Sequence, residues 1–183
     1  MKNLKPIKGD KKNKAIFLAG MFMIALIISF LPFHKYKTGN EAITGSKLGQ
    51  YAPDFETEYL NGTKFHLYEL RGKPVILNFW ASWCPPCVRE MPILGDFYIE
   101  HKDEILVIGI NLGEKDQAIE RFLKRVNVSF PIVKDKNNSI EGRYNLIIRP
   151  TTYFIDENGV IVDKRLGELK KEEIEERGRK LLK

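Results

Sequence analysis

Cysteine and histidine are scarce in this sequence, and their scarcity limits the metal sites that the chain could build. Among 183 residues there are two cysteines and three histidines. A structural zinc ion takes four protein ligands, but Cys84 and Cys87 are the only thiols, and the histidines at 34, 66 and 101 show no ligand spacing. The sequence therefore predicts no metal site, and nothing in it indicates a bound cofactor. A minor alternative is a copper-binding module in which His66 or His101 joins the two thiols.

A positive surplus is also missing from most of the chain, although its formal net charge is +6. Residues 1–38 contain eight lysines and one acid, a net +7, and the other 145 residues contain 22 basic and 23 acidic side chains, a net −1. A nucleic-acid-binding domain carries its basic surface on the folded part, so we exclude nucleic acid as a partner. Internal repeats and low-complexity tracts are absent as well. The bulk of the chain is therefore predicted to be an ordinary globular domain.

Charged residues are entirely absent from residues 15–33. A helix of these 19 residues would be about 28 Å long, close to the roughly 30 Å hydrocarbon core of a bilayer. Six lysines precede the segment, which keeps the N-terminus cytoplasmic and sends the rest of the chain outward. We therefore expect a cytoplasmic basic segment at 1–14, a transmembrane signal-anchor at 15–33, a tether at 34–50 and a folded domain at 51–183. A cleaved signal peptide is the rival interpretation, although no small-residue cleavage site follows closely.

Residues 51–183 alternate short apolar runs with amphipathic stretches. The runs at 74–80 and 105–111 are typical of strands buried on both faces. Asn61-Gly62 predicts a hairpin in which both turn residues have positive φ. We expect three helices: one from Cys84 to Glu100 with a kink at Pro92, one at 115–126, and one from Lys170 with a weak point at Gly178. The other expected elements are a strand at 130–133, a helix or turn at 138–145, and a hairpin at 151–155 and 160–165. The expected architecture is an α/β fold with a central mixed sheet and helices on both faces.

The segment Cys84-Pro85-Pro86-Cys87 stands at the expected start of a helix. A disulfide needs two sulfurs about 2 Å apart, and two intervening residues at a helix start allow this without moving the backbone. Unpaired N–H groups and the helix dipole stabilise a thiolate at that end, and the thiolate is the attacking species. The pattern predicts an enzyme of thiol–disulfide exchange, with Cys84 as the nucleophile and Cys87 as the resolving thiol.

Three motifs carry a resemblance to a known family: Asn78–Cys87 (NFWASWCPPC), Glu90-Met91-Pro92 and Arg149-Pro150-Thr151-Thr152. They resemble the thioredoxin superfamily and, more narrowly, the membrane-anchored ResA/TlpA/StoA group of extracytoplasmic thiol–disulfide oxidoreductases. Over residues 48–183 the resemblance implies a thioredoxin-like fold, in which the hairpin around Asn61-Gly62 precedes the main sheet. It also implies that Pro150 is a cis-proline facing the cysteines, and that client proteins bind at Trp83, Arg149 and Pro150.

Two charged residues have roles that the resemblance leaves open. In the ResA-like group a glutamate at the position of Glu90 takes part in the active site, so Glu90 would tune or deprotonate the cysteines; the alternative is a solvated glutamate on the helix surface. Arg149 would lower the pKa of Cys84 if it lies nearby, or else it faces solvent. Asn78 stands where cytoplasmic thioredoxins have a buried aspartate, so their usual proton relay is missing.

The direction of exchange is predicted from the two residues between the cysteines. Both residues between the cysteines are proline, without the histidine common in strong oxidases, and this favours a reductant. The resemblance implies a membrane electron donor of the CcdA/DsbD type and disulfide-containing exported clients such as apocytochrome c or envelope and spore proteins. A disulfide-introducing oxidase is one alternative. A thiol peroxidase is another alternative. That class of enzyme needs a proline seven residues before its reactive cysteine and a serine or threonine three residues before it. Leu77 and Ala81 occupy these positions before Cys84, and the required residues are also missing before Cys87.

Overall fold

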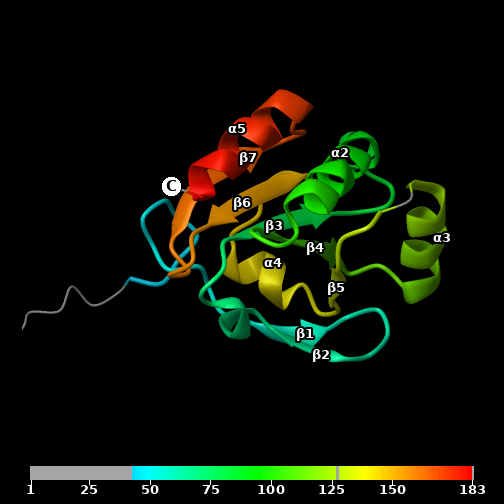
Figure 1. Ribbon diagram of the computed structural model, residues 1–183. Coiled ribbons are helices and arrows are strands. Elements are labelled where there is room, and N and C mark those ends of the chain that lie inside the picture. Colours follow the sequence, from blue (N-terminus) through cyan, green and yellow to red (C-terminus); the bar gives the residue numbers. More distant parts are fainter. Residues whose placement is uncertain (1–42, 127, 183) are drawn as a thin grey trace, which may run out of the picture. The chain divides into compact units, whose positions relative to one another are not determined.

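A computed structural model gives the structure of residues 43–126 and 128–182 (Figure 1). The predicted segments at 1–14 and 15–33, and most of the tether, lie outside these residues. The signal-anchor therefore stays a prediction. Within the described part of the chain, none of the helices combines the length and the apolar character needed to cross a membrane.

Five strands form the central sheet, in the spatial order β5-β4-β3-β6-β7 (Figure 1). β3 is parallel to β4 and β4 to β5, whereas β6 is antiparallel to both β3 and β7. All six residues of β3 are buried, as expected for the central strand of a sheet covered on both faces. The sheet is mixed, as predicted. The strands are β3 Val75–Trp80, β4 Leu106–Leu112, β5 Ile132–Asp135, β6 Thr151–Ile155 and β7 Ile161–Leu166.

The side chains of β3 alternate between two cores, one on each face of the sheet. Ile76 and Trp80 enter the core that also contains buried residues of α2, α3 and α5. Leu77 and Phe79 enter the core on the other face, with residues of α4 and of the β1–β2 region. Helices therefore cover both faces (Figure 1). The helices are η1 Leu67–Leu70, α2 Pro85–His101, α3 Asp116–Val126, α4 Ser139–Arg143 and α5 Lys171–Leu181.

The two short strands β1 (Glu56–Glu58) and β2 (Lys64–His66) pair antiparallel in a separate sheet. Their connection differs from the expected two-residue turn, because only Gly62 has a positive φ, of 82°. Asn61 instead uses its side chain, whose Oδ1 accepts a hydrogen bond from the Thr63 N–H at 3.0 Å. A single left-handed glycine after such a turn is typical of the longer hairpin loops.

Strand β5 begins at Ile132, two residues later than the 130–133 segment that the sequence predicts. Phe130 is buried in the core beside α2 and α3 instead of joining the ladder. Pro131 has no N–H to donate, and only its carbonyl bonds to β4, accepting from Gly109 N–H at 2.9 Å. The first residue of the predicted strand therefore packs in the core, and the pairing of β5 with β4 starts two residues later.

Gly178 lies inside α5, where the sequence predicts a weak point in the helix. The residue is buried, and a Cβ at this position would lie 2.3 Å from the ring of Phe97 on α2. Real contacts of this kind do not occur at such distances, so the missing side chain is what allows α5 to approach α2. The glycine is therefore a packing requirement of the α2–α5 interface.

We expect Gly178→Ala to destabilise the domain by about 1–3 kcal/mol, because overpacking against Phe97 outweighs a gain in helix propensity of up to about 1 kcal/mol. Gly142→Ala in α4 is the matched control, since a Cβ there would meet no atom within 4 Å. That variant is expected to be neutral or slightly stabilised. Urea unfolding of both variants measures the difference, and a Gly178→Ala variant as stable as the control would contradict the packing argument.

Candidate active site

Cys84 and Cys87 are joined by a disulfide at the start of α2, with their Cα atoms 5.3 Å apart. Cys84 is the N-cap residue, and its Sγ accepts a hydrogen bond from the Cys87 N–H at 3.3 Å. Pro85 and Pro86 occupy the first two helical positions and have no N–H to offer. Of the first three helical residues, only Cys87 therefore directs a backbone donor at the Cys84 sulfur.

The two cysteine residues differ little in exposure, whereas the tryptophan before them is largely exposed. Cys84 is 4% exposed and Cys87 1%, whereas the adjacent Trp83 is 66% exposed. The exposed indole directly before Cys84 gives this end of α2 an apolar surface that a binding partner can contact.

Glu90 is fully buried, one helical turn after Cys87 on the same helix. Its Oε1 accepts from Asn78 Nδ2 at 2.5 Å, and its Oε2 accepts from the Leu169 N–H at 2.6 Å. Burial raises the pKa of the Glu90 carboxyl to about 7, against the opposing effect of these two hydrogen bonds. The alternative of a solvated surface glutamate is therefore wrong.

The amide of Asn78 connects Glu90 to the neighbouring strand. Its Nδ2 donates both to Glu90 and, at 3.0 Å, to Thr152 Oγ1 on β6, while its Oδ1 is buried and has no hydrogen-bond partner among the described residues. Exchanging the two ends of the amide would let Oδ1 accept from a protonated Glu90 and from the Thr152 hydroxyl. The Asn78 amide can therefore donate to the ionised Glu90 carboxylate in one orientation and accept from the protonated carboxyl in the other.

The Arg149–Pro150 peptide bond is cis, as the resemblance implied. Thr151 and Thr152 pair with Phe79 and Asn78 of β3, so Pro150 lies level with the end of β3 from which the chain leads to Cys84. The orientation of the ring toward the sulfurs stays a prediction.

Arg149 does not face solvent freely, because its guanidinium forms an ion pair with Glu141 of α4. The same guanidinium lies 5.8 Å from the centre of the Trp83 ring, within the range of a cation–π contact. The structure therefore brings two of the three predicted client-binding residues together. The pairing with Glu141 offsets the charge that was expected to act on Cys84.

Sequence reasoning missed Glu114, which fixes the loop before the cysteines. Its Oε2 accepts from the Ser82 N–H at 2.6 Å and from Asn111 Nδ2 at 2.7 Å, and its Oε1 accepts from the Ser82 hydroxyl at 2.5 Å. Ser82 lies only two residues before Cys84. The one available signal was the position of Glu114 just after a predicted buried strand, at the sheet edge where the cysteine loop also begins.

Replacing Glu114 with glutamine is expected to slow disulfide exchange about three- to tenfold without unfolding the domain. An amide offers one oxygen where the carboxylate receives three donors, so the Ser82 loop loses about 1 kcal/mol of support or more. Stopped-flow exchange with a small disulfide measures the rate. Glu120→Gln, at an exposed position of α3, is the control, and equal rates in the two variants would contradict a positioning role.

The copper alternative with His101 is wrong on geometric grounds. Cys84 caps the first turn of α2 and His101 is the last of its 17 residues, so they are separated by about 26 Å at 1.5 Å per residue. His66, the other candidate, lies on β2 with its Nε2 2.6 Å from Asp54 Oδ2.

Comparisons with known proteins agree with this fold and site. Residues 48–164 match the AhpC/TSA family. The thioredoxin-like protein YneN of Bacillus subtilis is 36% identical over 88% of this chain and 95% of the relative, and the thiol-disulfide oxidoreductase ResA of Bacillus cereus is 34% identical over 90% and 95%. The crystal structure of StoA from Bacillus subtilis superposes with a TM-score of 0.61 at 31% identity, covering 69% of this chain and 96% of StoA.

The match extends through the cysteine segment and the sheet that supports it, and it covers nearly the whole length of these relatives. Together with a Cys84–Cys87 disulfide at a helix start and a cis-proline level with it, the comparisons identify the activity. The chain belongs to the AhpC/TSA family of thioredoxin-like proteins and is a thiol–disulfide oxidoreductase related to ResA.

Proposed function

We propose that this oxidoreductase reduces disulfides in exported proteins, working on the outer face of the cell membrane. The observation that carries the proposal is the Cys84–Cys87 pair, which forms a disulfide at the start of α2, a helix whose first two residues are both proline. The buried acid Glu90, one turn further along the helix, supplies a group that can exchange a proton near neutral pH.

The proposed reaction begins with the reduced protein. The Cys84 thiolate attacks one sulfur of a client disulfide, a mixed disulfide forms, and the other client sulfur leaves as a thiolate that takes a proton. Glu90 accepts the proton of the Cys87 thiol, whose sulfur then attacks Cys84. This step restores the Cys84–Cys87 disulfide, releases the second client thiol and completes the transfer of two electrons to the client.

The direction follows from how weakly the Cys84 thiolate is supported. Groups that stabilise the thiolate stabilise the reduced form and make a pair a stronger oxidant. Pro85 and Pro86 remove two backbone donors from the first helical turn, and Arg149 is engaged with Glu141. A less stabilised thiolate favours a reductant over the disulfide-introducing alternative.

Client binding is proposed at the surface around the cis-proline. Trp83, Ile147 and Ile148 are 66%, 89% and 46% exposed, and they lie shortly before Cys84 and Pro150 in the chain. Exposed apolar side chains of this size are typical of a docking surface. An extended client segment would lie along Pro150 with its disulfide above Cys84.

A reductase outside the cytoplasm must be recharged after each turnover. We propose a membrane electron donor of the CcdA/DsbD type, reached by anchoring the domain through residues 15–33, which carry no charge. Full-length protein should stay with the membrane after carbonate extraction, and protease added to intact spheroplasts should digest the domain. Release by carbonate, or protection from the protease, would contradict this placement.

Client reduction is tested with a peptide that contains the oxidised Cys-x-x-Cys-His segment of an apocytochrome c. Pre-reduced full-length protein is expected to convert the peptide to its dithiol while forming one Cys84–Cys87 disulfide per peptide. The oxidase alternative would be favoured if the oxidised protein oxidised the reduced peptide while the reduced protein failed to reduce the oxidised peptide.

A further inference from the structure

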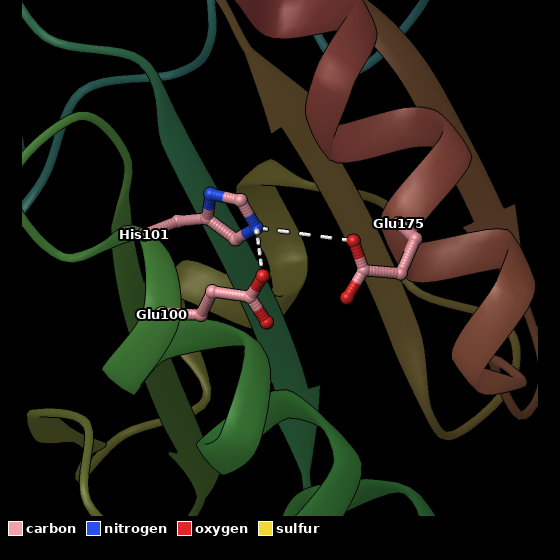
Figure 2. Close-up of side chains that lie close together, drawn as sticks. All are labelled: Glu100, His101 and Glu175. Carbon is pink, nitrogen blue, oxygen red and sulfur yellow. Dashed lines mark ion pairs between the residues drawn. The ribbon is translucent and has the colours of Figure 1, made fainter.

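The far end of α2 carries a cluster that the exchange reaction does not use. Glu100 and His101 end this helix, and Glu175 faces them from α5 (Figure 2). His101 Nε2 lies 4.0 Å from Glu100 Oε1 and 3.8 Å from Glu175 Oε2. One nitrogen and two oxygens thus lie within 4.8 Å of one another.

The imidazole of His101 is held in place, yet its Nε2 lacks a partner. The ring packs against Phe97 with centroids 4.4 Å apart, and its side chain is 16% exposed. The Nε2 atom itself is buried and makes no hydrogen bond to any described residue. A buried nitrogen without a partner is costly, and both carboxylate oxygens that it faces are too far away to bond to it.

We propose that Glu100, His101 and Glu175 bind a zinc ion that links the end of α2 to α5. Zinc bonds of about 2.0–2.2 Å in a tetrahedron place neighbouring donor atoms about 3.4 Å apart. The three donor atoms lie between 3.8 Å and at most 4.8 Å apart, so they must close by about 0.4–1.4 Å. Glu100, whose side chain is 69% exposed, has room to make this movement. Water would take the fourth position, so this site is of the open kind with three protein ligands, and not the closed four-ligand kind against which the sequence argues.

The surrounding charges suit a dication. The other imidazole nitrogen, Nδ1, lies 3.9 Å from Glu104 Oε2, beyond hydrogen-bond distance, and this carboxylate adds a further negative charge near the ring. Asp96 and Lys171 share a crevice with Glu100 and Glu175, and Arg179 lies 3.8 Å from Glu175. Acidic groups therefore outnumber cationic ones. An imidazole in the donor set favours zinc over calcium or magnesium, which prefer oxygen ligands alone.

This site would act on stability and not on exchange, because about 26 Å of helix separates His101 from Cys84. It would bridge the same two helices that meet where Gly178 packs on Phe97. Zinc would thereby fix the end of α2 against α5.

The test is calorimetric titration of the full-length chain in detergent with zinc chloride, with the Cys84–Cys87 disulfide formed so that no thiol can bind the metal. We expect one zinc per chain, and at least about tenfold weaker binding in His101→Gln and in Glu175→Gln. His66→Gln is the matched control, because that histidine is engaged with Asp54, and it should bind zinc like the unmodified protein. Equal affinity in all variants, or no binding below millimolar zinc, would overturn the proposal.

A second measurement keeps the test valid if one variant folds poorly. Zinc should raise the melting temperature of the unmodified protein and of His66→Gln, but not of Glu175→Gln. Removing the metal with a chelator should leave the rate of disulfide exchange unchanged. A zinc-dependent rise in melting temperature that persists in Glu175→Gln would contradict the bridge between the two helices.

Discussion

Replacing Cys87 with serine is expected to stop the reaction at a mixed disulfide between Cys84 and the client. Cys84 retains its place at the helix start, so its thiolate still attacks, but no second sulfur remains to release the partner. Multiple turnover should fall below detection while a covalent adduct accumulates. Non-reducing electrophoresis and mass spectrometry of the variant after mixing with an oxidised client peptide measure the adduct.

Cys84→Ser is the matched control, because it removes the proposed nucleophile and leaves the buried Cys87, which is 1% exposed. This variant should form no adduct and also lose turnover. The assignment of the two thiols would be reversed if the adduct formed on Cys87 in the Cys84→Ser protein and not on Cys84 in the other variant.

Glu90→Gln is expected to change both the pH profile of exchange and the pH dependence of stability. The folded-state pKa of Glu90 is raised to about 7 from its usual 4.5, so the folded protein binds this proton more tightly than the unfolded chain does. Stability from this group is therefore full below pH 4.5 and is lost as pH rises through 7. The loss amounts to about 3 kcal/mol over that window if burial acts undiminished.

Two measurements check the Glu90 prediction. Urea unfolding from pH 4 to pH 8 should show a downward slope in the unmodified protein that is largely missing in Glu90→Gln. Exchange rates should show an ionisation near pH 7 that the variant lacks, with a slower release of the mixed disulfide above that pH. Glu120→Gln controls for a changed surface charge. Parallel stability curves for Glu90→Gln and the unmodified protein would contradict a buried carboxyl that titrates near neutrality.

The parts of the fold that the sequence predicted are those that depend on short-range pattern. The apolar runs ending at Trp80 and Asn111 became β3 and β4, and the spacing of Cys84 and Cys87 is sufficient to place a disulfide at a helix start. Glu90 was found by its position relative to Cys87 within a family motif. Its burial was not predictable from spacing, because the groups that bond to it come from β3 and from the segment before α5.

Contacts between distant segments account for what was missed. Glu114 is 32 residues from Ser82, and the two meet only because β3 and β4 end at the same edge of the sheet, so their local sequences alone do not predict the contact. The ion pair of Arg149 with Glu141 depends on how α4 is placed beside the cis-proline. From the sequence of its helix alone, Gly178 is expected only to lower helix stability. The need for a residue without a side chain follows from the packing of Phe97 of α2 against this position.

The reduction potential of the Cys84–Cys87 pair tests the central claim most directly. Full-length protein in detergent would be equilibrated with glutathione or dithiothreitol buffers of known potential, and the dithiol fraction counted by thiol labelling. The account predicts a value below about −230 mV, nearer thioredoxin than DsbA, because the two prolines leave the Cys84 thiolate weakly supported. A value near −120 mV would contradict it, since a pair of that potential introduces disulfides instead of reducing them.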